Sequence, residues 1–282
     1  MGKMGNVLWG FFFAVSLAAA DGGAPTVLPA NAHPWGGYLP KSWCIVQTTT
    51  IANVGGQAVQ TVQTVRTELQ AVDADSVTLQ ESETLNVNGR SVSKNPQLIK
   101  YDFFQEPLQA NVKIRQGEPV KLQMSDKKTI IPCAVRIYEQ QTPSGQLTTT
   151  IWYSAQVYPY VLRAEKVLRS SPAGEDAGGE VIRQSVMLVQ ETSALKSLRG
   201  LRKNRTYTTQ TIEKAGNITK ITDANCSWDV PGGLLTATTR EFDAQNREIS
   251  RSVSTMTNYF LHEFVSRQPQ RVRTVLPAEM RY

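Results

Sequence analysis

The chain has 282 residues, of which 40% are hydrophobic and 19% are charged. This length predicts one or two domains, and the composition excludes a globally disordered chain. The formal net charge of +6 bears on solubility and on anionic partners rather than on the fold.

The N-terminus has the pattern of a signal peptide over residues 1–20. Lys3 precedes the apolar run "VLWGFFFAVSLAAA", and small residues at its end favour cleavage between Ala20 and Asp21. An uncleaved anchor is the alternative, but a bilayer span needs about 20 apolar residues. No later run is long enough, so we expect no transmembrane span in the mature chain. The prediction is export to a periplasm or to the outside of the cell.

The sequence contains three cysteines, Cys44, Cys133 and Cys226. In an exported protein they would meet an oxidising environment. They permit one disulfide with one thiol left over, or three buried free thiols. Their spacing matches no zinc motif, and no other pattern in the sequence indicates a metal or an organic cofactor.

Residues 21–40 hold four prolines and four glycines without periodicity. They are expected to form an extended linker or a strap lying on the domain. A single β-rich domain is predicted over residues 41–265, followed by a basic tail at 266–282 with Arg267, Arg271, Arg273 and Arg281.

Alternating β-rich segments separated by turns dominate the domain. Segments 43–51, 57–72 and 76–87 are strand-like, and Asn53–Gly56, Asp73–Asp75 and Asn88–Gly89 are turn signals. The predicted fold is all-β: a curved antiparallel sheet or half-barrel of roughly ten strands, with at most one or two short helices. One such helix is suggested by Leu195, Leu198 and Leu201.

Two stretches, 129–190 and 203–260, resemble each other as four-strand meanders. Gly145 and Gly216 occupy equivalent turns, and Pro159 and Pro231 follow in equivalent loops. We therefore expect the sheet to be built partly from two similar meanders.

The sequence offers little support for a catalytic function. A Ser-His-Asp device needs a histidine, and the mature chain has only His33, in the loosely held 21–40 segment, and His262 beside Glu263. No Gly-x-Ser-x-Gly, His-Glu-x-x-His or phosphate-binding glycine loop occurs. Asp73, Asp75, Glu81 and Glu83 fit a turn and a strand face better than a glycosidase pair. No catalytic residue is assigned.

Two sets of residues are candidates for binding. The aromatic loops offer Trp152, Tyr158, Tyr160 and Trp228 as ligand residues, although Trp228 also fits the role of a packing anchor in "WDVPGG". The run "KSLRGLRKNR" offers a basic surface without acids, formed by Lys196, Arg199, Arg202, Lys203 and Arg205. This run also fits a solvated surface without a partner. If it binds one, an exported protein would meet a lipid or an anionic envelope polymer, not nucleic acid.

The block "CAVRIYEQQTPSGQLTTTIWYSAQVYPY" resembles a pattern of uncharacterised secreted bacterial β-proteins, in which a Cys strand, a Gly turn, a W-x-S strand and a V-P-G-G loop follow one another. Cys133, Gly145, Trp152, Ser154 and Pro159 fit the pattern, whereas Tyr160 and Val161 replace its glycines. "SWCIVQTTT" and "VDADSVTLQ" are similar to the start of the same proteins. The resemblance implies export and a curved antiparallel sheet similar to periplasmic lipoprotein-carrier half-barrels, and no catalytic residues.

Three functional hypotheses follow. The first is an exported, non-enzymatic binding or carrier protein that holds an apolar or anionic cell-envelope ligand in the concavity of the sheet. The second is a structural or interaction protein of the envelope that uses the basic surface. The third is a hydrolase that uses His262.

Overall fold

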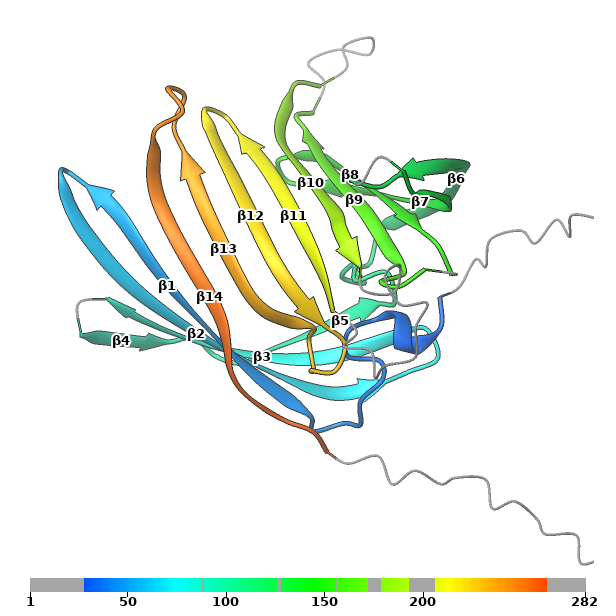
Figure 1. Ribbon diagram of the computed structural model, residues 1–282, viewed down its shortest axis with the longest axis horizontal. Coiled ribbons are helices and arrows are strands. Elements are labelled where there is room, and N and C mark those ends of the chain that lie inside the picture. Colours follow the sequence, from blue (N-terminus) through cyan, green and yellow to red (C-terminus); the bar gives the residue numbers. More distant parts are fainter. Residues whose placement is uncertain are drawn as a thin grey trace, which may run out of the picture.

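The computed structural model describes residues 28–262, apart from 88, 126–127, 156, 172–178 and 193–205. The described residues form one curved, unclosed antiparallel sheet of fourteen strands and a single 3-10 turn, Ala30–Ala32 (Figure 1). The strands are β1 Trp43–Val54, β2 Gln57–Val72, β3 Ser76–Val87, β4 Arg90–Ser93, β5 Gln97–Asp102, β6 Val112–Gln123, β7 Ile130–Thr142, β8 Gly145–Tyr153, β9 Val161–Arg169, β10 Val181–Thr192, β11 Thr206–Ala215, β12 Ile218–Ser227, β13 Leu234–Phe242 and β14 Glu248–Phe260.

The predicted all-β class is confirmed, with more strands than the roughly ten expected. One strand missed in the sequence is β4, which has only four residues, all of them exposed, and so lacks a readable alternation. Strand β5 ends at Asp102, and Phe103 and Phe104 turn into the core.

Tight glycine turns join many of the hairpins. Gly55 and Gly56 connect β1 to β2, and Gly89 stands between β3 and β4, all three with positive φ. Such angles suit glycine because it has no Cβ to collide with the backbone. The turns predicted at Asn53–Gly56 and at Gly89 are therefore confirmed.

The two expected meanders appear as consecutive runs in the sheet, β7–β10 and β11–β14. Gly145 and Gly216 lie in the first hairpin of each run, and Pro159 and Pro231 in the loop before its third strand. Strand β1 pairs with β14, so β1–β3 extend the sheet beyond the second meander.

The free edge at β6 is protected against pairing with other chains. The ladder to β7 is interrupted between Gly117 and Val120, where Pro119 has no N–H to offer. Lys113, Arg115 and Lys121 add charge along the strand. Bulges, prolines and charged side chains are the usual means of blocking an open edge.

Residues 28–40, here called the strap, hold the two ends of the sheet together. Leu28 and Trp35 are buried in one cluster with Leu69 of β2 and with Tyr153 of β8. Because strands from opposite ends of the sheet contribute to this cluster, the face they share is the concave one. The backbone also fastens the end of the strap to β2, since Lys41, the residue after the strap, donates its N–H to the carbonyl of Leu69 at 2.7 Å. For residues 28–40, the structure selects the strap over the extended linker.

The expectation that His33 lies in a loosely held segment is wrong. His33 is only 4% exposed, and its Nδ1 accepts a hydrogen bond from Trp35 N–H at 3.2 Å. Its ring lies 6.2 Å from that of Tyr101. Burial lowers its pKa from 6.5 to about 4, because the charged imidazolium loses its hydration.

All three cysteines are buried free thiols. Burial raises the pKa of Cys44 and of Cys133 to about 11, so little thiolate exists at neutral pH. Cys226 shows the same direction, also from burial. Of the two alternatives left open by the sequence, free thiols are the ones that the structure contains.

The buried His33 predicts a specific acid sensitivity. Because its folded pKa is depressed, its contribution to stability is complete above pH 6.5 and is lost as the pH falls from 6.5 towards 4, by up to about 3 kcal/mol. Urea unfolding at pH 7 and at pH 4.5 should show that His33→Asn, which keeps an acceptor but no titrating ring, loses less stability on acidification than the wild type. The matched control is His262→Asn at an exposed position, which should leave the acid loss unchanged. An identical acid loss in wild type and His33→Asn would contradict this account.

Candidate functional site

The open part of the concave face carries hydroxyl side chains rather than apolar ones. Residues directly opposite each other on paired strands share a face. Following the register from β11 to β2 gives an unbroken row across six strands: Thr211, Thr222, Thr239, Ser252, Thr50 and Thr61. Hydroxyl pairs hydrogen-bond within it, as Thr222 to Thr239 at 2.9 Å and Thr50 to Ser252 at 2.8 Å.

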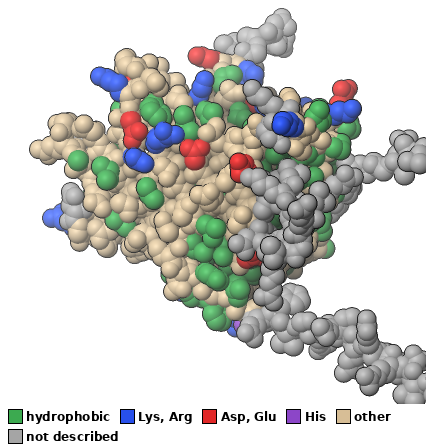
Figure 2. Space-filling model, viewed as in Figure 1, with side chains coloured by type: hydrophobic (Ala, Val, Ile, Leu, Met, Phe, Trp, Pro, Cys, Tyr) green, Lys and Arg blue, Asp and Glu red, His purple; other side chains and the backbone are tan. Residues whose placement is uncertain are grey.

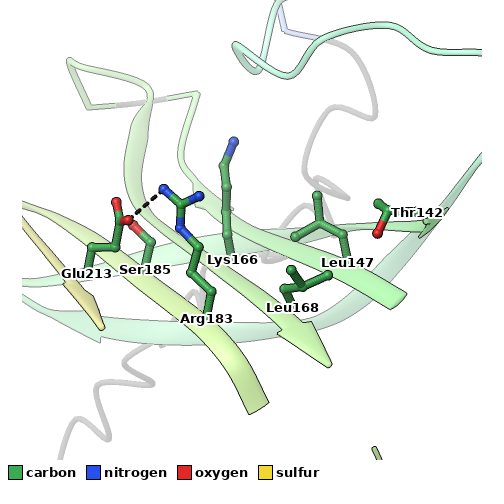
Figure 3. Close-up of a pocket in the computed structure, with 7 residues that line it drawn as sticks. All are labelled: Thr142, Leu147, Lys166, Leu168, Arg183, Ser185 and Glu213. Atoms are coloured by element: carbon green, nitrogen blue, oxygen red, sulfur yellow. Dashed lines mark ion pairs between the residues drawn. The ribbon is translucent and has the colours of Figure 1, made fainter. Parts of the chain in front are cut away.

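A groove of about 330 Å³ lies on this face, beyond the region that the strap fills (Figure 3). Its floor comes from β8–β11 with the end of β7. Leu147 and Leu168 are its apolar part, and Lys166 and Arg183 rise beside each other from the adjacent strands β9 and β10. The lining is Thr142, Leu147, Lys166, Leu168, Arg183, Ser185 and Glu213.

Each base in the groove is paired with an acid that is less exposed than itself. Lys166 Nζ lies 2.8 Å from Glu106 Oε1, with side-chain exposures of 43% and 12%. Arg183 Nη2 lies 2.5 Å from Glu213 Oε1, with exposures of 57% and 23%. The cations therefore face solvent, while their counter-ions lie deeper. Burial raises the pKa of Glu106, although Lys166 opposes the shift.

A smaller hollow of about 110 Å³ continues the groove, sharing Leu147 and Lys166 with it. Tyr138 lines it and donates a hydrogen bond to Asp102, which also accepts from the backbone N–H groups of Phe104 and Glu106. Burial raises the pKa of Tyr138, and the adjacent Asp102 carboxylate adds to the shift. This network fixes the turn after β5 and so places Glu106 under Lys166.

Three of the four predicted ligand residues come together, away from the groove. The Trp228 ring is 4.4 Å from that of Tyr158, and Tyr160 and Tyr207 lie at 6.5 and 6.4 Å. Trp152 is separate from them: it lies under the guanidinium of Arg163, at 4.6 Å. Among the described residues, the buried Trp228 Nε1 has no hydrogen-bond partner. None of the four lines the groove, and ligand contact at them stays a prediction.

The "WDVPGG" loop packs against the strap. The Trp228 carbonyl accepts a hydrogen bond from Tyr38 Oη at 2.5 Å, and Val230 and Pro231 are buried. Gly232 has a φ of +77°, and an added Cβ would lie 3.1 Å from the Trp35 ring. The surroundings of Trp228 match its interpretation as a packing anchor.

The remaining sequence candidates are the basic run, the predicted cleavage position and His262. The basic residues Lys196, Arg199, Arg202, Lys203 and Arg205, the helix suggested there, and the cleavage position Ala20–Asp21 lie outside the described residues. His262 is exposed after β14, and its backbone N–H donates to Ser42 Oγ at 3.1 Å. In the described ranges no acid is paired with its imidazole, and no cluster of His, Cys, Asp and Glu is arranged to hold a metal ion.

The groove residues were missed in the sequence, although its strands were recognised. Lys166 and Leu168 alternate on β9, and Arg183 and Ser185 on β10, which marks one face of each strand. The sequence alone does not reveal the strand register, which sets Lys166 opposite Ser185, and Ser185 opposite Glu213.

Over the described residues, the structure has no helix long and apolar enough to cross a membrane.

Comparison with known proteins gives no family. No family model matches the chain, and no curated protein matches it. It is similar to the solved structure of a candidate outer membrane lipoprotein-sorting protein domain from Vibrio parahaemolyticus, at 8% identity and a TM-score of 0.34, over 79% of this chain and 86% of that one. A candidate exported protein with a YmcC-like fold from Bacteroides fragilis is similar at 6% identity and a TM-score of 0.27, over 79% and 98%. Both TM-scores are too low for either likeness to bear on what this chain binds.

The fit between Gly232 and Trp35 can be measured. In Gly232→Ala, a left-handed backbone costs about 1–2 kcal/mol, and the new Cβ must also displace Trp35. The control is Gly55→Ala, since Gly55 has a φ of +59° but no neighbouring atom within 4 Å of the added Cβ. We expect the free energy of unfolding to fall by about 1 kcal/mol more at Gly232, the low end of an overpacking cost. Equal losses in urea denaturation would show that the loop does not press on the strap.

Proposed function

We propose that this protein is an exported, non-enzymatic binding protein that holds an anionic, partly apolar envelope ligand in the concave groove. One observation carries the proposal: Lys166 and Arg183 stand side by side, more exposed than their own counter-ions, next to Leu147 and Leu168. Ligand sites are typically concave and partly apolar, with a few convergent polar groups.

The chemistry of the groove narrows the ligand. A guanidinium offers two parallel N–H donors to a phosphate or carboxylate, and an ammonium adds a point charge. The two leucines offer contact to a short stretch of hydrocarbon. The volume of about 330 Å³ lies near the lower end of the range for small-molecule sites. This size suits a head group with part of one chain, not a whole two-chain lipid.

The same geometry disfavours a purely apolar ligand. The apolar part of the concave face is already covered by the strap, whose Leu28 and Trp35 are buried there. The open part carries the hydroxyl row and the charged groove. Burying these groups under hydrocarbon would remove their hydration without replacing it.

Titration calorimetry with monomeric lysophosphatidylglycerol, against zwitterionic lysophosphatidylcholine, tests the proposal on the chain from Asp21 onward. The anionic amphiphile should bind the more tightly. Arg183→Gln removes a charge-assisted contact and should weaken its binding about tenfold. Glu213→Gln removes the competing carboxylate and should tighten it.

Arg240→Gln is the matched control. Arg240 also pairs with an acid, Asp223 at 3.4 Å, but it faces the convex side of β13. It should leave binding unchanged. No binding of the anionic amphiphile, equal binding of both amphiphiles, or an Arg183→Gln variant with unaltered affinity would each reject an anion site in the groove.

A further inference from the structure

The end of the sheet where β1 begins and β14 finishes presents aromatic side chains to solvent. Tyr259 and Phe260 are 44% and 47% exposed, and Leu261 follows them. Trp43 lies opposite Phe260 and stacks on it, with ring centroids 6.3 Å apart. We call Trp43, Tyr259, Phe260 and Leu261 the aromatic end.

The side chains of the aromatic end lie on both faces of the sheet. Phe260 pairs with Trp43 on one face, and Tyr259 is opposite Cys44 on the other. Figure 2 shows hydrophobic side chains gathered on the lower part of the described surface, where β1 begins and β14 finishes in Figure 1. Grouped exposed aromatic and aliphatic side chains mark a surface that meets an apolar partner, because isolated ones are the norm on a soluble protein.

Charged side chains adjoin this surface. Arg66 lies over the Trp43 ring at 4.8 Å and forms an ion pair with Glu68 at 2.9 Å, so these two charges balance each other. In the sequence, His262 and Glu263 follow the aromatic end, and residues 264–278 after them contain Arg267, Arg271 and Arg273 without any acid. The acids that flank this run are Glu263 and Glu279.

We infer that the aromatic end docks on the surface of an anionic lipid bilayer. Tryptophan and tyrosine prefer the interface between water and hydrocarbon, where an apolar ring and a polar group are both accommodated. Arginines close to such a surface add about 1 kcal/mol each when the lipids are anionic. Aromatic side chains beside an acid-free basic run therefore match a membrane surface. This docking surface is distinct from the groove and does not depend on the ligand proposed for it.

Co-sedimentation of the chain from Asp21 onward with lipid vesicles tests the inference. Vesicles of equal parts phosphatidylglycerol and phosphatidylcholine should bind the protein, and binding should fall at high salt, which screens the attraction. Vesicles of phosphatidylcholine alone should bind it much more weakly. Replacing Arg267, Arg271 and Arg273 by serine should lower the partition coefficient about fivefold for each residue.

The aromatic contribution needs its own variant and control. The double substitution Tyr259→Ser and Phe260→Ser should lower partitioning about tenfold or more. The double substitution Val92→Ser and Leu98→Ser removes two exposed apolar side chains from β4 and β5 and should have no effect. Thermal unfolding establishes that each variant is folded. If the aromatic variant does not fold, the partitioning of the arginine variant decides the test. Lipid with brominated chains should quench the fluorescence of the wild type more than that of Trp43→Phe.

Three results would overturn the inference. One is equal binding to charged and uncharged vesicles together with an unaltered arginine variant. Another is wild-type partitioning of the folded aromatic variant. The third is a dimer in light scattering that Phe260→Ser dissociates, because the aromatic end would then be an interface between two copies of the chain.

Discussion

The structure depends on the way the strap fills one part of a curved sheet that does not close. A curved sheet turns apolar side chains of distant strands toward one another, and without a cover they would remain in water. Leu28 and Trp35 supply that cover between β2 and β3 on one side and β8 and β9 on the other. The strap is thus a component of the core, although its proline and glycine content gives it the appearance of a linker.

The limits of the strap explain the chemistry of the remaining concave face. On a single cross-strand row, the residues change from Ile151, Ala164 and Met187 on the packed side to threonine and serine on the open side. Hydroxyls keep a hydrated surface while satisfying one another across the strands, so the open half needs no lid to be stable in water. The groove lies next to this transition, where leucines and charged side chains meet.

The sequence predicted the local features and missed the long-range ones. Gly55, Gly89 and Gly216 marked real turns because a tight hairpin depends on a few adjacent residues. The role of His33 was misjudged because its burial comes from residues far away in the sequence, among them Tyr101. The groove was missed for the same reason: Lys166 and Glu106 are 60 positions apart, and only the register of β9 and the turn after β5 bring them together. The sequence offered the aromatic loops as a candidate ligand site. In the structure, the Trp228 ring packs against tyrosines, and the Trp228 carbonyl accepts a hydrogen bond from the strap residue Tyr38.

If the groove binds an anion as proposed, its ion pairs determine which anions can compete for Lys166 and Arg183. Lys166 and Arg183 are already neutralised, so an anion gains affinity only by interacting with them better than Glu106 and Glu213 do. A simple monovalent ion offers no such advantage, because it replaces one carboxylate with an equivalent charge and must itself be desolvated. A head group that carries several oxygens would contact both cations at once, and so would compete with both glutamates through one molecule. An attached hydrocarbon adds contact with Leu147 and Leu168, which the glutamates cannot make. Under the proposed function, the pairing would therefore favour a multidentate, amphipathic anion over the small anions of the surrounding solution.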